Sequence, residues 1–249
     1  MAETFYIEGL FEFLKKEISE CKEKGNSELE CLNFNNIMLE QNPYILKSKS
    51  YLLSVPEIVK NLFDNRIFET QQVNFDEFSK KIAIFVAHKV YGGTKSSAEG
   101  IDLEFEKDAV RFIVSIKSGP NWGNSGQIQK MKDNFKKTKK IIGTNASKIN
   151  VIAVNGCCYG RDNKPDKGDY LKLCGQSFWE FISGNSNFFI EIIEPLSFQS
   201  KEKNDSYLQS YAQMLNKFIL KFTTEFCDDG IINWERIVKF NSAIEKPKK

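Results

Sequence analysis

The stretches Gly100-Ile101-Asp102-Leu103-Glu104-Phe105 and Phe112-Ile113-Val114-Ser115-Ile116-Lys117 decide the fold expected for this chain. These two short apolar segments predict a β-hairpin at the edge of a sheet. Strand side chains alternate with period two, so Asp102 and Glu104 share one face of the first strand, and Ser115 and Lys117 share one face of the second. The hairpin therefore predicts a cluster of acids with one lysine, which is typical of metal-dependent phosphodiester cleavage.

The elements around the hairpin predict an α/β fold. A helix is expected over residues 74–91, another over 127–142 and a buried strand over 148–155. An additional strand is expected over 188–193. This order predicts a mixed central sheet flanked by helices.

Three regions are expected along the chain, forming one compact unit. Residues 1–73 are a helical N-terminal region, with helices over 4–22 and 55–63, and Gly25 and Asn26 supply a stop after the first of them. Residues 74–200 form the core that carries the hairpin. Residues 201–249 are a C-terminal helical region.

Composition indicates an ordinary globular protein, because 41% of the 249 residues are hydrophobic and 27% are charged. No apolar stretch approaches the roughly 20 residues that cross a bilayer, and the N-terminus lacks the pattern of a secretory signal. We therefore expect a cytoplasmic protein with no membrane span. The net charge of +2 does not by itself indicate a polyanionic partner.

Six cysteines are expected to stay reduced in such a chain. Cys157, Cys158 and Cys174 lie in one region, which leaves a zinc site as an alternative. No CxxC pair occurs, however, and the only histidine, His88, lies far upstream in a helical pattern.

The hairpin offers ligands that suit Mg2+. The Asp102 carboxylate is the first expected ligand, and the Ile116 carbonyl lies between Ser115 and Lys117. Lys117 would orient or deprotonate an attacking water, or stabilise developing charge. The alternative is the wet face of an ordinary antiparallel sheet, on which acids and lysines also alternate with apolar residues.

Polar residues after the hairpin predict contacts to DNA. The glycine-rich loop over 118–126 and the start of the following helix would approach phosphates, basic residues on that helix would neutralise them, and a later polar loop would reach base edges. A tight turn, a solvated helix face and a solvated loop are the corresponding structural alternatives. The expected DNA-binding residues are Asn121, Trp122, Asn124, Gln127, Gln129, Lys130, Arg161, Asn163 and Lys164.

Residues 98–105 and 114–124 resemble the PD-(D/E)XK nuclease superfamily and, within it, the type II restriction endonucleases. The later segments 155–160 and 174–184 strengthen this resemblance, which covers roughly Gly92 to Leu196. It implies a restriction-endonuclease-like core over 74–200. Asp102 takes the place of the first acid of the motif, and Lys117 takes that of its lysine.

The chain departs from the motif at Ser115, because the superfamily usually has Asp or Glu there. Some enzymes with a similar serine take the acid from the following helix, but that region here holds Gln127 and Gln129, and Asp133 is the nearest downstream acid. Glu104 is the first choice for the second metal ligand because it shares the face of Asp102. Glu77 on the preceding helix is the second choice.

The resemblance implies an Mg2+-dependent enzyme that cuts double-stranded DNA at a short specific sequence. A homodimer would cut the two strands with two symmetry-related sites, and a cognate DNA methyltransferase would be the companion activity. The alternatives are a catalytically inactive, nuclease-like DNA-binding protein and a repair or structure-selective nuclease.

Overall fold

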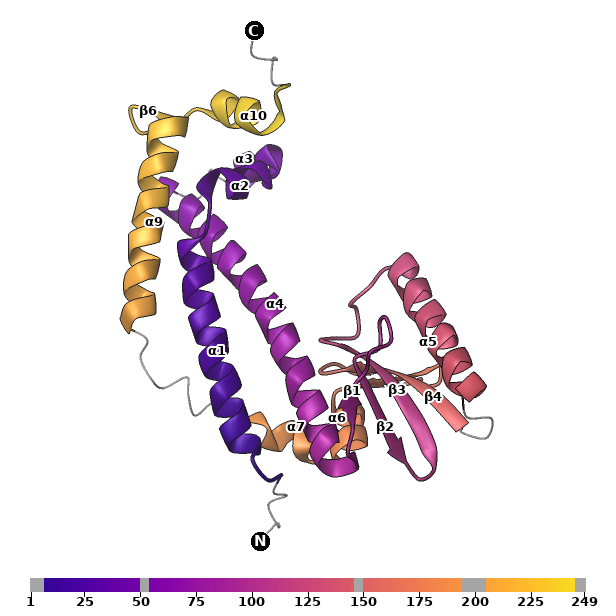
Figure 1. Cartoon of the computed structure of the whole chain (residues 1–249). Coiled ribbons are helices and arrows are strands. Elements are labelled where there is room, and N and C mark those ends of the chain that lie inside the picture. The colour runs from indigo at the N-terminus through magenta and orange to yellow at the C-terminus, as the bar shows by residue number, and fades with distance from the viewer. Residues whose placement is uncertain (1–6, 50–53, 146–149, 194–204, 245–249) are drawn as a thin grey trace. The chain divides into compact units, whose positions relative to one another are not determined.

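The computed structural model describes residues 7–49, 54–145, 150–193 and 205–244. The chain divides into two units. The first contains residues 1–20 and 74–202, and the second contains residues 21–73 and 203–249. Each unit therefore combines segments that are far apart in the sequence, as the colours in Figure 1 show.

The first unit contains a mixed sheet of five strands in the order β1-β2-β3-β4-β5. Strands β1, β2 and β3 are antiparallel, whereas β3, β4 and β5 are parallel. The predicted α/β fold with a mixed sheet is thus confirmed. The predicted edge position of the hairpin is wrong, because β4 pairs with β3 on the side away from β2. The bounds are β1 (Thr94–Lys95), β2 (Leu103–Lys107), β3 (Val110–Lys117), β4 (Asn150–Cys157) and β5 (Leu171–Cys174).

The hairpin of β2 and β3 is confirmed, with Leu103 opposite Val114. Its two turn residues, Asp108 and Ala109, both have positive φ angles, of 51° and 60°. Positive φ at both central positions gives a turn whose twist matches that of the flanking strands.

Helices cover both faces of this sheet (Figure 1). On one face, Phe105 of β2 stacks on Tyr91 of α4 (Val55–Tyr91), and Phe112 of β3 meets Phe181 of α6 (Gln176–Ser183). On the other face, Ile113 packs in a buried cluster with Met131 and Phe135 of α5 (Ser125–Asn145). Helix α5 also connects β3 to its parallel neighbour β4, as a parallel pair requires.

Gly156 on β4 lets α6 approach the sheet. A Cβ atom at this position would lie 2.1 Å from Cε2 of the Phe178 ring. Phe178 is fully buried, so the ring occupies the volume that any larger residue at 156 would need.

Three predictions of secondary structure are wrong. Helix α1 (Leu10–Glu30) continues through Gly25, and α4 is one helix where two segments were expected. The expected strand over 188–193 is instead α7 (Phe188–Glu191) with Ile192 as its C-cap, and Phe188 and Ile192 are buried while Ile190 is exposed. Burial at a spacing of four is helical, but so short an apolar run does not distinguish helix from strand in the sequence.

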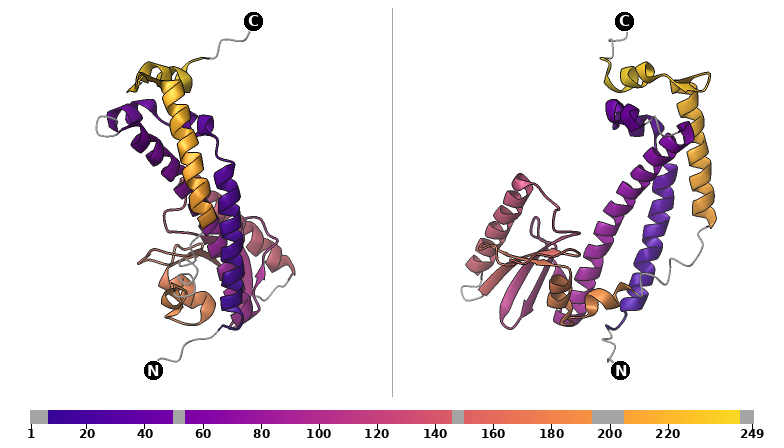
Figure 2. Two further views of the ribbon diagram at one scale, coloured as in Figure 1. Left: turned by 90° about the vertical axis from the view of Figure 1, so that its left-hand side faces the viewer. Right: turned by 180° about the vertical axis from the view of Figure 1, so that it is seen from behind.

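The second unit is helical. Its elements are the end of α1, the start of α4, α2 (Phe34–Leu39), α3 (Pro43–Lys49), α9 (Asp205–Phe226), α10 (Trp234–Ser242) and a small hairpin of β6 (Cys227–Asp228) and β7 (Ile231–Ile232). Phe34, Phe63 and Phe218 form its aromatic centre, with ring centroids 5.1 Å apart for Phe63 and Phe218 and 5.5 Å apart for Phe34 and Phe218. Figure 2 shows α9 alongside the first half of α4, and residues of both helices pack with Leu29 at the end of α1 in one buried cluster.

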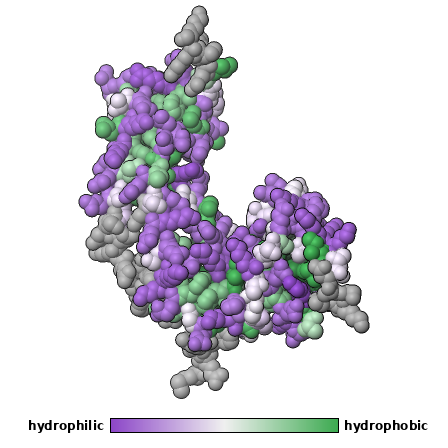
Figure 3. Space-filling view, in the orientation of Figure 1, coloured by the Kyte–Doolittle hydropathy of each residue, from purple (hydrophilic) through white to green (hydrophobic). Residues whose placement is uncertain are grey.

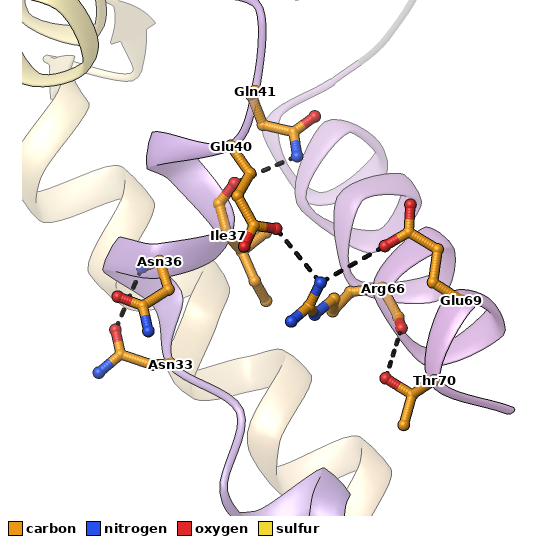
Figure 4. Close-up of polar contacts among 8 residues, drawn as sticks. All are labelled: Asn33, Asn36, Ile37, Glu40, Gln41, Arg66, Glu69 and Thr70. Atoms are coloured by element: carbon orange, nitrogen blue, oxygen red, sulfur yellow. Dashed lines mark hydrogen bonds and ion pairs between the residues drawn. The ribbon is translucent and has the colours of Figure 1, made fainter. Parts of the chain in front are cut away.

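Polar contacts at one end of this unit fix α2 against α4 (Figure 4). Asn33 caps α2 by accepting hydrogen bonds from the main-chain N–H groups of Asn35 and Asn36. Arg66 of α4 reaches Glu40 at 3.2 Å and Glu69 at 3.5 Å. Exposed ion pairs of this kind contribute little free energy, whereas the aromatic centre is part of a larger buried hydrophobic cluster. Among the described residues, no helix is long and apolar enough to cross a membrane.

Candidate active site

The Asp102 carboxylate ends the pairing of β2 with β3. The main-chain N–H of Asp102 donates to the Val114 carbonyl (2.8 Å), although the register places Leu103 opposite Val114. The Oδ2 atom of Asp102 then accepts a hydrogen bond from the Ile116 N–H (2.6 Å). The side chain of Asp102 therefore takes the place of the main-chain acceptor that a continuing ladder would offer to Ile116.

The Ile116 carbonyl is oriented toward the same side. The N–H and C=O groups of one strand residue point to the same neighbour, and the Ile116 N–H points to Asp102. The Ile101 N–H, which a continuing antiparallel pair would offer to this carbonyl, donates instead to Ala98. One carboxylate and one main-chain carbonyl thus face the same space, and such oxygen donors suit Mg2+, which retains several waters.

Lys117 is the last residue of β3 and lines a cavity of about 520 Å³. Burial lowers the pKa of its amine, and the charge of Lys80 lowers it further, while the Asp102 carboxylate acts in the opposite direction. A lysine with a lowered pKa releases a proton more readily, which suits a group that activates water. The cavity also contains Asp76, Lys80, Ser115, Trp122 and Lys130.

Helix α4 contributes two site residues that sequence reasoning missed. The Nζ atom of Lys80 lies 3.4 Å from Oδ1 of Asp102, and Asp76, one turn earlier, lines the same cavity. Asp76 and Lys80 are four residues apart on the helix just before the hairpin, so they share one face of that helix. This spacing is the sequence signal that could have identified them. Glu77, the second choice for a metal ligand, is exposed and is not part of the cavity lining.

Glu104 has a different environment from Asp102. Its Oε2 atom accepts hydrogen bonds from Nη2 (2.7 Å) and Nε (3.2 Å) of Arg111, and its Oε1 atom accepts one from the Ser96 hydroxyl. Neither Asp102 nor Glu104 is among the residues that line the cavity, but Asp102 contacts two residues next to or in it, Ile116 and Lys80. Ser115 does line it, although its side chain is almost fully buried. The hairpin therefore places Ser115 and Lys117 in the cavity, binds the Asp102 carboxylate to the N–H of Ile116 between them, and directs Glu104 to Arg111.

The predicted DNA-binding residues of the first loop and of α5 form several local contacts. Asn124 and Gln127 cap the start of α5 reciprocally, since each main-chain N–H donates to the side-chain oxygen of the other at 3.0 Å. Gln129 donates to Asp133 (2.9 Å), and Lys130 lies 3.7 Å from Glu99. Asn121 is exposed. Hydrophilic residues predominate over α5 in Figure 3.

The later polar loop, residues 158–170, is joined to the loop that follows Lys117. Arg161, Asn163 and Lys164 are exposed on it. Asp162 between them accepts hydrogen bonds from the Lys164 N–H (2.9 Å) and the Lys167 amine (3.0 Å). Lys172 lies 3.7 Å from Asp162 and donates to the Pro120 carbonyl (2.9 Å).

The three clustered cysteines carry raised thiol pKa values. Cys157 and Cys174 are opposite each other on β4 and β5, and burial raises the pKa of both. Burial also raises the pKa of Cys158 to about 12. Zinc binds thiolates, and no three His, Cys, Asp or Glu residues in the described part of the chain are grouped to hold a metal ion.

A mixed five-stranded sheet between helices, with the Asp102 carboxylate hydrogen-bonded to β3 one residue before Lys117, is consistent with an α/β protein that has a restriction-endonuclease-like core. The family model of the type II restriction endonuclease EcoO109I matches residues 8–204, which is most of the chain. The chain therefore belongs to the EcoO109I family of type II restriction endonucleases. No curated protein matches it.

Proposed function

We propose that this protein hydrolyses phosphodiester bonds of double-stranded DNA at a short specific sequence in an Mg2+-dependent reaction. The observation that carries the proposal is the Asp102 carboxylate, which accepts a hydrogen bond from the Ile116 N–H and acts electrostatically on the amine of Lys117, the last residue of β3. Family membership supports DNA as the substrate.

Asp102 and the Ile116 carbonyl would hold the ion. When bound, Mg2+ supplies positive charge to the phosphate oxygens and lowers the pKa of a bound water. The Ile116 N–H fixes the carboxylate of Asp102 in position before substrate arrives, and Lys117 would orient the attacking water and accept its proton. Asp102 lies 3.4 Å from Lys80, so its charge is already compensated in the protein described here.

The second carboxylate of the site is best supplied by Asp76. Glu104 was the first choice from the sequence, but Arg111 and Ser96 hold its oxygens away from the cavity. Asp76 lines the cavity beside Lys117. The loss of the acid at Ser115 would thus be offset by an acid from α4.

DNA binding would use the exposed residues near the cavity. Lys130 lines it, and Arg161, Asn163 and Lys164 extend from the loop that Lys172 joins to Pro120. Arg and Lys suit guanine, and Asn suits adenine, in the major groove. We propose that the enzyme acts as a homodimer with two active sites and that a DNA methyltransferase protects the host sequence.

Digestion of unmethylated DNA of known sequence tests the proposal. With Mg2+ we expect discrete fragments whose sequenced ends share one motif, and with EDTA we expect intact DNA. Lys117→Ala should abolish cleavage and keep specific binding measured in Ca2+. Intact DNA with wild-type protein and Mg2+, across many sequences, would contradict the proposal.

Ser115 favours a second candidate function. Because the motif lacks its usual acid, a protein that binds DNA without cutting it is the alternative. Sequence-specific binding without any Mg2+-dependent product would identify this function, and a nuclease whose products follow DNA structure rather than a motif would identify a repair activity.

A further inference from the structure

Trp122 lies against the amine of Lys117. The Nζ atom of Lys117 is 4.6 Å from the centroid of the Trp122 ring, and both residues line the cavity. Ammonium groups within about 6 Å of a tryptophan face are attracted by the negative charge of that face. The ring therefore holds the charged end of a side chain that otherwise has four rotatable bonds.

The indole of Trp122 is itself fixed by a buried amide. Its Nε1–H donates to Oδ1 of Asn155 (3.1 Å), and Nδ2 of Asn155 donates to the Ser115 carbonyl (3.2 Å). Asn155 is 1% exposed and lies opposite Ser115 in the register of β3 and β4. A closed chain of contacts therefore runs from Lys117 through Trp122 and Asn155 back to the strand that carries Lys117.

We propose that Trp122 and Asn155 are positioning residues, which hold the Lys117 amine toward the reacting phosphate. The role of Lys117 as the water-activating group rests on the function proposed above. The sequence predicts Trp122 as a DNA contact, but the indole N–H, the one hydrogen-bonding group of its side chain, already donates to Asn155. A base or phosphate would have to break this bond to use the indole N–H.

Two substitutions separate the ring face from the indole N–H. Trp122→Leu removes both, whereas Trp122→Phe keeps an aromatic face and loses only the N–H. A cation–π contact of about 0.5–2 kcal/mol corresponds to roughly a 2- to 30-fold change in rate. We expect single-turnover cleavage to slow by roughly 10- to 30-fold in Trp122→Leu and by no more than about 5-fold in Trp122→Phe.

DNA affinity distinguishes positioning from a DNA contact. We expect the dissociation constant for cognate DNA in Ca2+ to stay within about 2-fold of wild type in both Trp122 variants. Weaker binding with an unchanged cleavage rate would show that Trp122 contacts DNA and would overturn the proposal.

Lysine methyl resonances test the geometry without any activity. Reductive methylation with 13C-formaldehyde keeps the ammonium charge, and the ring current of Trp122 should displace the Lys117 methyl signal, which Lys117→Met identifies by its loss. We expect this signal to return to the ordinary lysine position in Trp122→Leu and to move part of the way in Trp122→Phe and Asn155→Leu. The Lys107 signal, 5.1 Å from the Tyr91 ring, is the control and should not move.

The outcomes are distinguishable from failure of the proposed function. An unchanged Lys117 signal in Trp122→Leu overturns the positioning role whether or not the protein cleaves DNA. A displaced signal in a wild-type protein that cuts no DNA supports the contact chain and contradicts the nuclease function. Should Trp122→Leu fail to fold, the position of the Lys117 methyl signal is compared between Trp122→Phe and wild type. The signal should still move, because loss of the N–H releases the ring from Asn155.

Discussion

The Asp102 carboxylate accepts a hydrogen bond of 2.6 Å from the main-chain N–H of Ile116. One acid therefore both ends the strand pairing and acts electrostatically on the lysine that follows Ile116. The structural role of Asp102 needs only an oxygen atom that accepts the Ile116 N–H, whereas metal binding needs the negative charge of the carboxylate. Substitution can therefore separate the two roles.

Asp102→Asn should abolish Mg2+-dependent cleavage and leave the fold intact. The amide oxygen can still accept the Ile116 N–H, so we expect a free energy of unfolding within about 1 kcal/mol of wild type. Asp102→Ala leaves this N–H without its acceptor and should cost about 1–3 kcal/mol. Denaturant titrations of both variants check this, and equal stability of the two would contradict the structural role.

Lys117→Met should abolish cleavage without lowering stability at neutral pH. Burial lowers the pKa of Lys117 in the folded state, so the unfolded chain binds its proton more tightly and the wild type gains stability as pH rises toward the ordinary lysine value. The stability advantage of the variant should therefore shrink between neutral pH and about pH 10.5. Unfolding curves at several pH values measure the difference in free energy of unfolding between the variant and wild type. A difference that grows with pH would contradict the lowered pKa of Lys117.

Asp76→Asn and Glu104→Gln form a matched pair of neutralised acids. We expect the first to slow cleavage by at least about 10-fold, because Asp76 lines the cavity. The second should keep cleavage within about 3-fold and lower stability by up to about 1 kcal/mol, since the Glu104–Arg111 pair is partly exposed. The reverse pattern in cleavage rates would identify Glu104 as the metal ligand.

Asp162→Ala should loosen the loop over 158–170. The Lys164 N–H, Lys167 and Lys172 hold the pKa of Asp162 below its usual value, so its contribution to stability is present at neutral pH and is lost as pH falls through the lowered pKa. We expect faster proteolytic cleavage at Arg161 or Lys164 and weaker DNA binding. Lys140→Ala on α5 removes an exposed lysine outside this loop and should leave the proteolysis rate unchanged.

Gly156→Ala should destabilise the first unit by about 1–3 kcal/mol or more, because the new methyl group would collide with the Phe178 ring. Phe178→Leu should cost free energy on its own, but it should reduce the effect of Gly156→Ala. A double-mutant cycle of thermal unfolding checks this coupling. Additive effects would show that Phe178 is not the obstacle.

The sequence by itself determined the hairpin, the α/β class with a mixed sheet, and the helices that flank it. These follow from local physics: the strands alternate with period two, the helices repeat apolar residues every three to four positions, and Gly92 and Gly93 mark where a helix ends. The resemblance carried by residues 98–105 and 114–124 also indicated the nuclease family that the family model shows.

Only the tertiary structure decided which groups surround Lys117. Trp122 reaches it from a loop and is anchored by Asn155 on the next strand, while Lys80 of α4 lines the same cavity and acts on it electrostatically. The sequence favoured Glu104 as a second ligand because strand periodicity places it beside Asp102, but periodicity cannot reveal that Arg111 lies within reach of the same carboxylate. Contacts between residues distant in the chain depend on how the strands and helices pack, and local spacing contains no such information.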